Sequence, residues 1–134
     1  MDVPRCREKA MRPLNVAVVS TGGAGRAHAA RFEKNPKSRL RALFDVKEES
    51  LASMESYEAR GAYLTSDYKR ILNDDEIEVI SVCSPDSTHS AYAVEALEAG
   101  KNVLVEKPMA TTIEQCREMA AAADAGRGIF GVHH

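Results

Sequence analysis

Apolar and polar positions follow two alternating patterns along the chain from Leu14 onward. Short, nearly continuous apolar runs are typical of strands buried on both faces of a sheet. Longer stretches between them carry apolar residues at helical spacing. We therefore expect strands at 15–20, 40–44, 63–64, 77–83, 102–105 and 129–132. We expect helices at 25–34, 48–60, 67–72, 86–99 and from 111 to 125.

Strands that alternate with helices predict a parallel sheet with right-handed crossovers. Six strands and five helices in this order favour an α/β fold of three layers. We expect a Rossmann fold, which is a doubly wound, mainly parallel sheet with the strand order 3-2-1-4-5-6. Gly61 and Gly100 stand where glycine commonly ends a helix, after the second and fourth predicted helices.

The last predicted helix opens on a capping box, with Thr111 as the N-cap and Glu114 reaching back to it. Apolar residues then recur at helical spacing and predict the buried stripe of this helix. The stripe consists of Ile113, Cys116, Met119, Ala120 and Ala123.

The composition is that of an ordinary globular domain, with 44% hydrophobic and 28% charged residues in a chain of 134. Basic side chains number 18 against 20 acidic ones, so the basic excess typical of nucleic-acid binding is missing. No apolar run approaches the roughly 20 residues that span a bilayer. We expect a flexible polar arm at 1–12, a single domain at 13–134, and neither nucleic acid nor membrane as a partner.

Three cysteines, Cys6, Cys83 and Cys116, lie far apart in the sequence. Their odd number and wide separation match neither a disulfide framework nor the spacing of a zinc site, so we expect no metal. Free cysteines and the absence of a secretory signal favour a reducing, cytoplasmic location. Cys83 and Cys116 fit the small apolar residues of a core.

A glycine-rich turn, Ser20-Thr-Gly-Gly-Ala-Gly25, directly follows the first expected strand. Gly22 takes the position of the dinucleotide fingerprint that lets the backbone approach the pyrophosphate, and Gly25 the position that allows close helix–strand packing. Ser20 replaces the usual first glycine, where a Cβ is unfavourable if φ is positive. The pyrophosphate would lie at the helix N-terminus, against the amides of Gly23 and Ala24.

Asp45 ends the second expected strand, about 20 residues after the glycines, where an acidic residue binds the ribose 2′-hydroxyl of NAD. It would repel the 2′-phosphate of NADP, which makes NADP the less favoured cofactor, and Lys47 is the only nearby cation that could soften this. Two simpler interpretations stay open. The glycines can form a tight turn without a ligand, and Asp45 can be a solvated strand end or the cap of the next helix.

Later segments resemble the GFO/IDH/MocA oxidoreductases, the family of glucose–fructose oxidoreductase and inositol dehydrogenase. The segment from Ser84 to His89 reads S-P-D-S-T-H, close to the family's T-P-N-x-x-H. After it come Ala96-Leu97, Ala99-Gly100-Lys101 and Val103-Leu-Val-Glu106-Lys107-Pro108, as in the family's A-L-x-A-G-K-H-V-x-x-E-K-P. The resemblance runs from Leu14 to His134. Ser20 and Asp86 depart from the pattern, where the family has glycine and asparagine.

The resemblance implies a hydride transfer between nicotinamide and a hydroxyl-bearing carbon of a sugar or polyol. It implies that Lys107 is catalytic and assists the proton transfer, and that the Lys107–Pro108 peptide is cis. The cofactor residues that it implies beside the glycine turn are Ser84, Pro85, Asp86, His89 and Glu106. His89 has an equal alternative as a first-turn residue satisfied by nearby backbone. Without the resemblance, Lys107 would be better interpreted as a solvated lysine at a strand end. We expect His28 to serve helix–sheet packing.

Family members carry a second α/β domain for substrate binding and oligomerisation, and this chain ends about where that domain would begin. We therefore expect the cofactor domain alone, without turnover by itself. A free-standing NAD-sensing module and a folded remnant that binds nothing are the competing hypotheses. We also expect self-association through the last strand or the region of Pro108, near Phe130, because apolar surface and a sheet edge would be exposed there.

Overall fold

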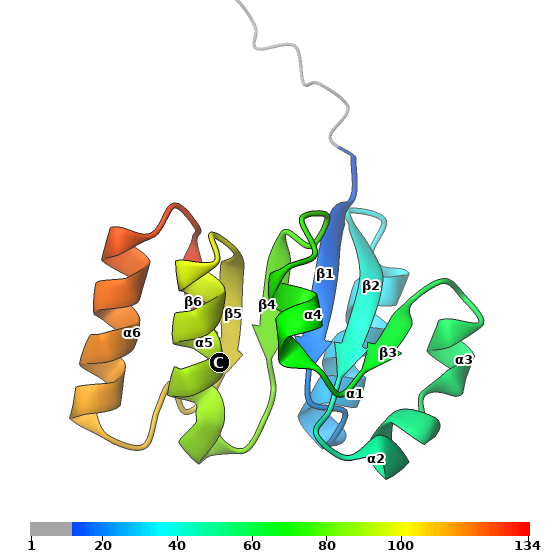
Figure 1. Cartoon of the computed structure of the whole chain (residues 1–134), viewed down its shortest axis with the longest axis horizontal. Coiled ribbons are helices and arrows are strands. Elements are labelled where there is room, and N and C mark those ends of the chain that lie inside the picture. Colours follow the sequence, from blue (N-terminus) through cyan, green and yellow to red (C-terminus); the bar gives the residue numbers. More distant parts are fainter. Residues whose placement is uncertain (1–11) are drawn as a thin grey trace, which may run out of the picture.

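The computed structural model describes residues 12–134, so the arm expected at 1–12 lies outside the described residues except for Arg12. All six expected strands are present, and Figure 1 shows them as one sheet with helices on both sides. The strands are β1 (Leu14–Val19), β2 (Ser38–Phe44), β3 (Tyr63–Thr65), β4 (Val79–Val82), β5 (Asn102–Glu106) and β6 (Phe130–His133). The helices are α1 (Gly23–Lys34), α2 (Glu48–Ala52), α3 (Glu55–Glu58), α4 (Tyr68–Leu72), the 3-10 turn η1 (Asp86–Thr88), α5 (His89–Glu98) and α6 (Ile113–Ala125).

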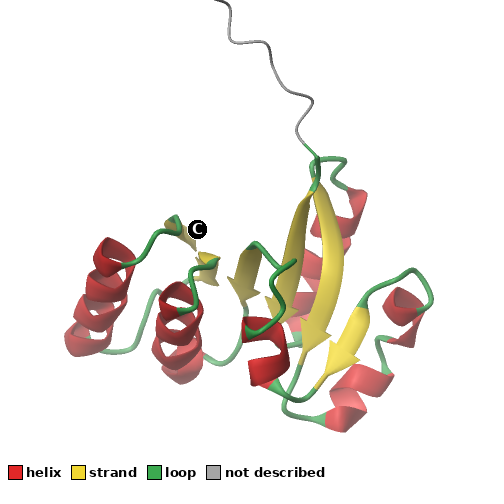
Figure 2. Cartoon of the chain, turned by 45° about the horizontal axis from the view of Figure 1, so that its top comes forward, coloured by secondary structure: helices red, strands yellow, loops and turns green. Residues whose placement is uncertain are grey.

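The strands form one parallel sheet in the order β3-β2-β1-β4-β5-β6, which confirms the predicted Rossmann topology. Figure 2 shows their common direction. The chain winds outward from β1 to β2 and β3 on one side, and from β4 to β5 and β6 on the other. The winding therefore reverses between β1 and β4, the point at which open α/β sheets bind ligands beyond their carboxyl ends.

Two apolar layers, one on each face of the sheet, form the core. Val18 belongs to the layer that also contains Ala29 of α1, whereas its neighbour Val19 belongs to the layer that also contains Leu97 of α5. Both valines have no exposed surface, because successive strand residues point to opposite faces and both faces are covered. The near-continuous apolar run in this strand thus reflects burial on two sides.

The single helix expected at 48–60 is wrong, because two short helices, α2 and α3, occupy this stretch. They are separated at Ser53 and Met54. The hydroxyl of Ser53 donates to the carbonyl of Ser50 at 2.6 Å, a local bond that competes with continued helix. Met54 is 1% exposed and packs into the layer beneath α1. Gly61, which ends the pair, has φ of +106° and so takes the left-handed conformation expected of a terminating glycine.

The helix expected at 86–99 also differs at its start, which is the 3-10 turn η1 rather than α-helix. Thr88 donates its hydroxyl to the carbonyl of Pro85 and to the hydroxyl of Ser84, both at 2.7 Å. These bonds hold the tighter turn ahead of α5, as is common at helix ends.

The cap of α6 lies one residue later than expected. Thr112 is the N-cap, and its hydroxyl oxygen accepts from the amide of Gln115 at 3.2 Å. Gln115, not Glu114, reaches back, but its Oε1 accepts from the amide and the hydroxyl of Thr111, one residue before the N-cap. The expected capping box is therefore wrong in its residues, and its second bond goes to the residue that precedes the N-cap.

The buried stripe of α6 is also narrower than expected. Met119 has no exposed surface, whereas Ile113 is 64% exposed and Ala120 is exposed. Ala122 and Ala123 pack beside Met119 against the core. The helix lies at the end of the molecule, beside α5 (Figure 1), and Met119 is its one buried residue.

An ion pair ties the start of β1 to the start of β4. The guanidinium of Arg12 donates to both carboxylate oxygens of Glu78, at 2.8 and 2.9 Å. The amide of Asn15 donates to the same carboxylate at 2.9 Å. These bonds hold the pKa of Glu78 below its ordinary value, the bond from Arg12 being the largest cause. They lie at the amino edge of the sheet, opposite the ligand-binding edge.

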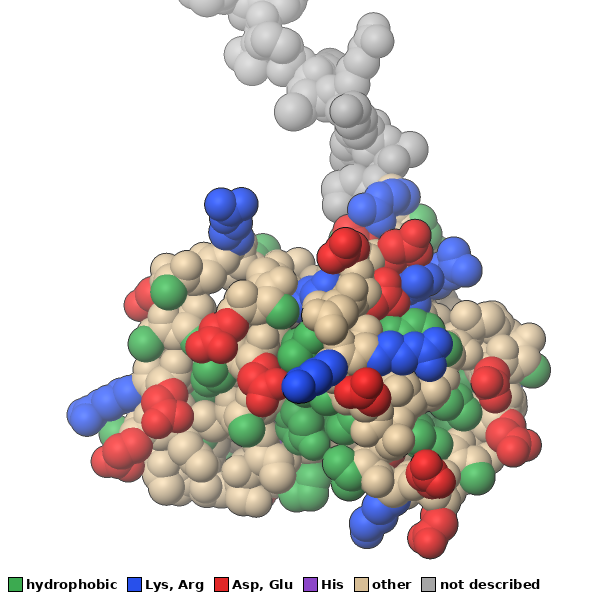
Figure 3. Space-filling view, in the orientation of Figure 1, with side chains coloured by type: hydrophobic (Ala, Val, Ile, Leu, Met, Phe, Trp, Pro, Cys, Tyr) green, Lys and Arg blue, Asp and Glu red, His purple; other side chains and the backbone are tan. Residues whose placement is uncertain are grey.

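Acidic and basic side chains are interspersed over the face of the molecule seen in Figure 3, without a continuous region of one sign. Within residues 12–134, none of the helices is both long enough and apolar enough to cross a membrane.

Candidate functional site

A cleft of about 340 Å³ lies at the carboxyl edge of the sheet, beside the reversal point between β1 and β4. Its size falls in the range of small-molecule sites. The walls come from the β1–α1 turn, the end of β2, α2, and the β4–α5 connection. The residues that line it are Val19, Ser20, Gly22, Phe44, Asp45, Val46, Lys47, Ser50, Ser84, Pro85, Thr88 and Tyr92.

The glycine turn brings the start of α1 against the end of β1. Ser20 has φ of +81°, the left-handed conformation in which a Cβ is strained and glycine is usual. A Cβ placed on Gly25 would lie 1.8 Å from the carbonyl oxygen of Ser20. Gly25 therefore permits the close approach of helix and strand, as its position in the fingerprint predicts. A Cβ on Gly22 would meet only Ser20 Oγ, at 3.9 Å, so the exposed backbone at Gly22 is open toward the cleft.

The first turn of α1 presents free amides next to this backbone. The first bond of the helix runs from the amide of Arg26 to the carbonyl of Gly22 at 2.9 Å. The amides of Gly23, Ala24 and Gly25 precede that bond and have no acceptor within the helix. Such amides, together with the positive end of the helix dipole, form a site for a phosphate.

Asp45 joins the end of β2 to the glycine turn. Its Oδ2 accepts from the amide and the hydroxyl of Thr21, and its Oδ1 accepts from the amide of Lys47. Burial alone would raise the pKa of Asp45, but these hydrogen bonds bring it below its ordinary value. The carboxylate is therefore ionised near neutral pH, is 8% exposed, and borders the cleft. Oδ1 accepts only one of these bonds and keeps a lone pair that a ligand hydroxyl can use.

Aromatic rings line part of the cleft. Phe44 and Tyr92 both line it, with ring centroids 5.7 Å apart in an edge-to-face arrangement. Tyr68 packs on both rings and donates its hydroxyl to the carbonyl of Tyr92 at 2.7 Å. This wall gives an apolar surface against which a planar ring can pack.

The predicted site residues of the β4–α5 connection differ in whether they reach the cleft. Ser84 and Pro85 line the cleft. Asp86 is exposed at the start of η1 and is not among the lining residues. His89 is 1% exposed, and its two ring nitrogens each lie 2.8 Å from a backbone carbonyl oxygen, that of Pro108 and that of Ser84. The ring therefore leaves no nitrogen for a ligand, which favours the interpretation of His89 as satisfied by backbone.

Lys107 follows β5 at the same edge of the sheet, and its side chain is exposed. The Lys107–Pro108 peptide is cis, as the resemblance implied. Lys107 forms no ion pair with any residue of the described range, and it is not among the residues that line the cleft.

Glu106 turns its carboxylate away from the cleft, toward α1. Its Oε1 lies 2.8 Å from His28 Nε2 and 2.9 Å from His133 Nδ1, and its Oε2 accepts from the amide of Lys107 at 3.0 Å. Burial alone would raise the pKa of Glu106, but the bonds from His28, the amide and His133 bring it below its ordinary value. His28 is 4% exposed between α1 and the sheet, as expected of a packing residue.

Sequence reasoning missed two residues that organise the site, Thr21 and Arg26. Thr21 is 2% exposed and bonded to Asp45 across 24 positions of sequence. Arg26 donates to the carbonyl of Thr21 at 3.0 Å and contacts the hydroxyl of Ser53. A threonine within a glycine turn and an arginine in a first helical turn carry no local signal for these contacts. Thr21 thus ties the turn to the end of β2, and Arg26 ties it to Ser53 at the end of α2.

The residues present fit a dinucleotide. The free amides of α1 suit a pyrophosphate, the Asp45 carboxylate suits a ribose hydroxyl, and the aromatic wall suits a flat base. The cleft also lies where Rossmann folds bind such ligands, at the reversal of the winding.

Comparisons with known proteins agree with this geometry. The sequence pattern of an oxidoreductase family described by its NAD-binding Rossmann fold matches residues 14–134. Inositol 2-dehydrogenase of Paracoccus denitrificans is 34% identical over 113 residues, which are 84% of this chain and 34% of that protein. The crystal structure of GenD2 from gentamicin A biosynthesis, in complex with NAD, has a TM-score of 0.84 at 31% identity and covers 90% of this chain.

Levoglucosan dehydrogenase, in complex with NADH and L-sorbose, has a TM-score of 0.79 at 28% identity over 89% of this chain. The matched part is 34% of the GenD2 chain and 33% of the levoglucosan dehydrogenase chain. This chain therefore spans about a third of the length of the relatives that it matches.

Proposed function

The chain belongs to the GFO/IDH/MocA oxidoreductase family, and we propose that it binds NAD in the cleft at its carboxyl edge as the nucleotide half of a dehydrogenase. The observation that carries the proposal is the joining of Asp45 to the glycine turn. It sets an ionised carboxylate in the cleft that Gly22 also lines, and Gly22 directly precedes the free amides of α1. A ribose and a pyrophosphate are neighbours in a dinucleotide and require these two groups side by side.

NAD is the favoured cofactor over NADP in this proposal. The carboxylate of Asp45 borders the cleft, and a 2′-phosphate on the ribose would bring a second negative charge against it. Lys47 also lines the cleft and is the cation that could offset part of this repulsion. We expect NAD to bind about tenfold more tightly than NADP, or about 1.4 kcal/mol.

Lys107 is the residue that we propose for the proton transfer. When bound, NAD supplies the carbon that accepts or returns a hydride. The hydroxyl of the substrate must lose or regain a proton in the same reaction, and a lysine amine near that oxygen can hold it. The exposed side chain of Lys107 at the carboxyl edge supports this role. Ser84 and Pro85, at the same edge, would border the nicotinamide side of the cleft.

A sugar or polyol is the substrate class that we propose for the whole protein. Inositol 2-dehydrogenase and levoglucosan dehydrogenase, among the relatives, are named for substrates of this class. We propose that the substrate-binding walls belong to a part of the protein outside the third that this chain spans in those relatives. We therefore expect NAD binding without turnover from these residues alone, in a cytoplasmic setting that suits the free thiols of Cys83 and Cys116.

A nucleotide-binding module without turnover is the alternative function. The described residues supply a cofactor cleft and a single candidate for acid–base work, Lys107, which suits a sensor as well as an enzyme half. The two are separated by activity in the protein that carries this chain, assayed with NAD and myo-inositol. The control is Lys34→Ala, which changes a matched exposed lysine in the last turn of α1. The protein is an enzyme if turnover is lost in Lys107→Ala and kept in Lys34→Ala.

Self-association remains part of the proposal. β6 is an edge strand, and Ile129, just before it, is 78% exposed. An edge strand beside an exposed apolar side chain favours pairing with a second copy. Light scattering over a concentration series should show a dimer, and a constant monomer mass would contradict it.

NAD binding itself is tested by calorimetry with two glycine variants. Gly22→Ala adds a methyl group that the fold can accommodate but that enters the cleft, so NAD affinity should fall at least about tenfold. Gly131→Ala is the matched control, because its Cβ would also meet one side chain at 3.9 Å, on β6 far from the cleft. Equal NAD affinity in the two variants, or no NAD binding by the unmodified chain, would overturn the proposal.

A further inference from the structure

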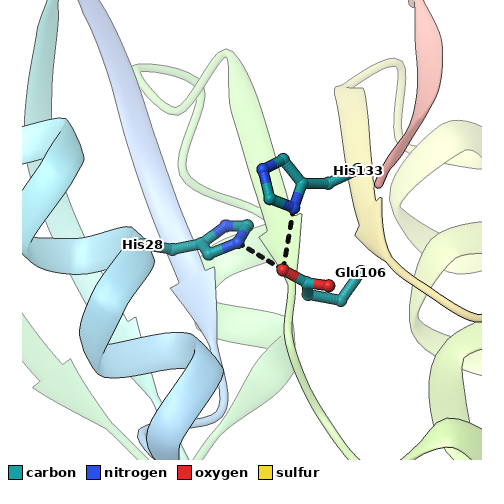
Figure 4. A group of neighbouring side chains, drawn as sticks. All are labelled: His28, Glu106 and His133. Atoms are coloured by element: carbon teal, nitrogen blue, oxygen red, sulfur yellow. Dashed lines mark hydrogen bonds and ion pairs between the residues drawn. The ribbon is translucent and has the colours of Figure 1, made fainter.

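Three side chains from separate elements converge on the face of the sheet that carries α1. Figure 4 shows His28 from α1, Glu106 from the end of β5 and His133 from the end of β6, with both imidazoles directed at one carboxylate oxygen. Glu106 and His133 are paired residues of adjacent strands, so their side chains leave the sheet on the same face. The donor atoms of the three residues all lie within 4.8 Å of one another.

We propose that His28, Glu106 and His133 form a binding site for a divalent transition-metal cation of the Zn²⁺ type. Two imidazole nitrogens and one carboxylate are a donor set that proteins use for zinc, with a fourth position left to water. The proposal does not depend on NAD binding, because the three donor groups lie outside the cleft.

The separations of the donor atoms suit such an ion after a small adjustment. Zinc bonds to nitrogen and oxygen are about 2.0–2.2 Å, which places tetrahedral donor atoms roughly 3.3 Å apart. The two imidazole nitrogens now lie 2.8 and 2.9 Å from Oε1, so each contact must open by about half an ångström. His133 is 39% exposed at the end of its strand and has room to make this movement.

Ser81 supplies the outer contact that a metal-binding histidine requires. Its hydroxyl lies 2.8 Å from His28 Nδ1, on the side of the ring opposite Glu106. Metal-bound histidines commonly donate their second ring N–H to an oxygen, which fixes the ring and its tautomer. A hydroxyl can donate or accept, and the Ser81 hydroxyl also lies 3.6 Å from Cys83 Sγ. It can therefore accept a hydrogen bond from the N–H at Nδ1 when Nε2 binds the ion.

Charge and access also favour a cation. The cluster offers one carboxylate and two imidazole nitrogens and no Lys or Arg side chain, a donor set that suits a cation. The side chain of Glu106 is 15% exposed and that of His28 is 4% exposed, whereas His133 opens to solvent. An ion and its water can thus reach the site from the side of His133.

The test is a calorimetric titration of the chain with Zn²⁺ after treatment with a chelator, in the unmodified protein and in four variants. We expect one saturable site. His133→Gln and Glu106→Gln each remove a donor and should weaken binding at least tenfold, and Ser81→Ala should weaken it about tenfold to a hundredfold. His134→Gln is the matched control, since this neighbouring exposed histidine lies outside the cluster and should leave the affinity unchanged.

Imidazole ¹⁵N chemical shifts of the unmodified chain give a second measurement that needs no substitution. Zn²⁺ should shift Nε2 of His28 and Nδ1 of His133 while the signals of His89 stay in place. The absence of a saturable site would overturn the proposal. The proposal would also be overturned if His134→Gln lowered the Zn²⁺ affinity as much as His133→Gln does. A third contrary result would be Zn²⁺-induced shifts confined to the ring of His134.

Discussion

The carboxylate of Asp45 binds Thr21 at both of its polar groups, with Oδ2 accepting from the amide at 2.9 Å and from the hydroxyl at 3.0 Å. The acid that faces the cleft therefore also fixes the turn that would hold the pyrophosphate. Any change at Asp45 acts on two parts of a bound dinucleotide at once.

Asp45→Asn should reduce the preference for NAD over NADP by about tenfold, because the charge that repels a 2′-phosphate is removed. The neutral amide can still accept from Thr21 through its one oxygen, so the fold should persist. Asp86→Asn removes the same charge from an exposed position outside the cleft lining and serves as the control. Calorimetry with both nucleotides measures the ratio, and an equal change in the two variants would contradict the role of Asp45.

Asp74 should make the stability of the chain depend on acid pH. Its carboxylate accepts from Arg41, from the hydroxyl of Tyr63 and from the amide of Glu76, at 2.8, 2.9 and 3.1 Å. Burial alone would raise the pKa of Asp74, yet these bonds bring it below its ordinary value of 3.8. A lowered pKa in the folded state adds stability above about pH 4, and this stability is lost as the pH falls through the folded value.

Asp74→Asn should therefore lower the free energy of unfolding at pH 7 by about 1.5–3 kcal/mol, the usual range for hydrogen bonds to a charged group. The difference from the unmodified chain should shrink as the pH falls below about 4, because the carboxyl group is protonated first in the unfolded chain and then, at its lowered pKa, in the folded chain. Urea unfolding at pH 7 and pH 3 measures both values. Asp75→Asn, at the exposed neighbouring position, should have no comparable effect, and a difference that is the same at both pH values would argue against this account.

Ser20→Gly should stabilise the chain by about 0.5–1 kcal/mol. The left-handed conformation costs a residue with a Cβ about 1–2 kcal/mol. Part of this gain is offset because glycine raises the conformational entropy of the unfolded chain. Ser20 holds φ of +81°. Ser20→Ala keeps the Cβ and should bring no such gain. Thermal unfolding of the two variants separates the backbone effect from the loss of the hydroxyl, and a gain in both would exclude the backbone explanation.

Gly25→Ala should destabilise the chain by at least about 3 kcal/mol, at the upper end of overpacking effects. The added Cβ would lie 1.8 Å from the carbonyl oxygen of Ser20, so helix and strand must separate. Gly23→Ala is the matched control in the same turn of α1, with nothing within 4 Å of the new Cβ. It should be neutral or stabilising, since alanine favours helix. Chemical denaturation measures both, and similar losses would show that the packing argument fails.

Cys83 should resist alkylation that modifies Cys116. Burial raises the pKa of the Cys83 thiol to about 11, whereas Cys116 is half-buried on α6. The reactive species is the thiolate, so at pH 8 Cys83 should react about a hundredfold more slowly than a thiol with the ordinary pKa of about 8.5. Peptide mapping by mass spectrometry after timed iodoacetamide treatment distinguishes the positions. Comparable labelling of the two cysteines in folded protein would be inconsistent with the burial of Cys83.

The strands were predictable because their burial on two faces leaves a local trace in the sequence. Val18 and Val19 face opposite layers, and only an uninterrupted apolar run can satisfy both. The breaks within helices left no such trace. The stretch at 48–60 is amphipathic throughout, and its interruption depends on the burial of Met54 and the local bond of Ser53, which are set by the rest of the fold.

The site was predictable where one short segment determines it and not where distant segments meet. Gly25 and Ser20 belong to one turn, and their roles follow from a known backbone geometry. Glu106 meets His28 and His133 only after the sheet has formed, across 78 and 27 positions of sequence. Spacing rules for metal sites examine near neighbours, so this cluster could not be found from the sequence alone.

The bond between Arg12 and Glu78 has a practical consequence for binding measurements. It holds the beginning of the described chain at the amino edge of the sheet, and β1 then runs on the order of 15–20 Å to the edge that carries the cleft. Protein attached to a sensor surface at the amino edge of the sheet, near Arg12, would thus turn its cleft toward the flowing solution. Attachment after His133 would instead anchor the molecule at its ligand-binding edge, beside the residues under test.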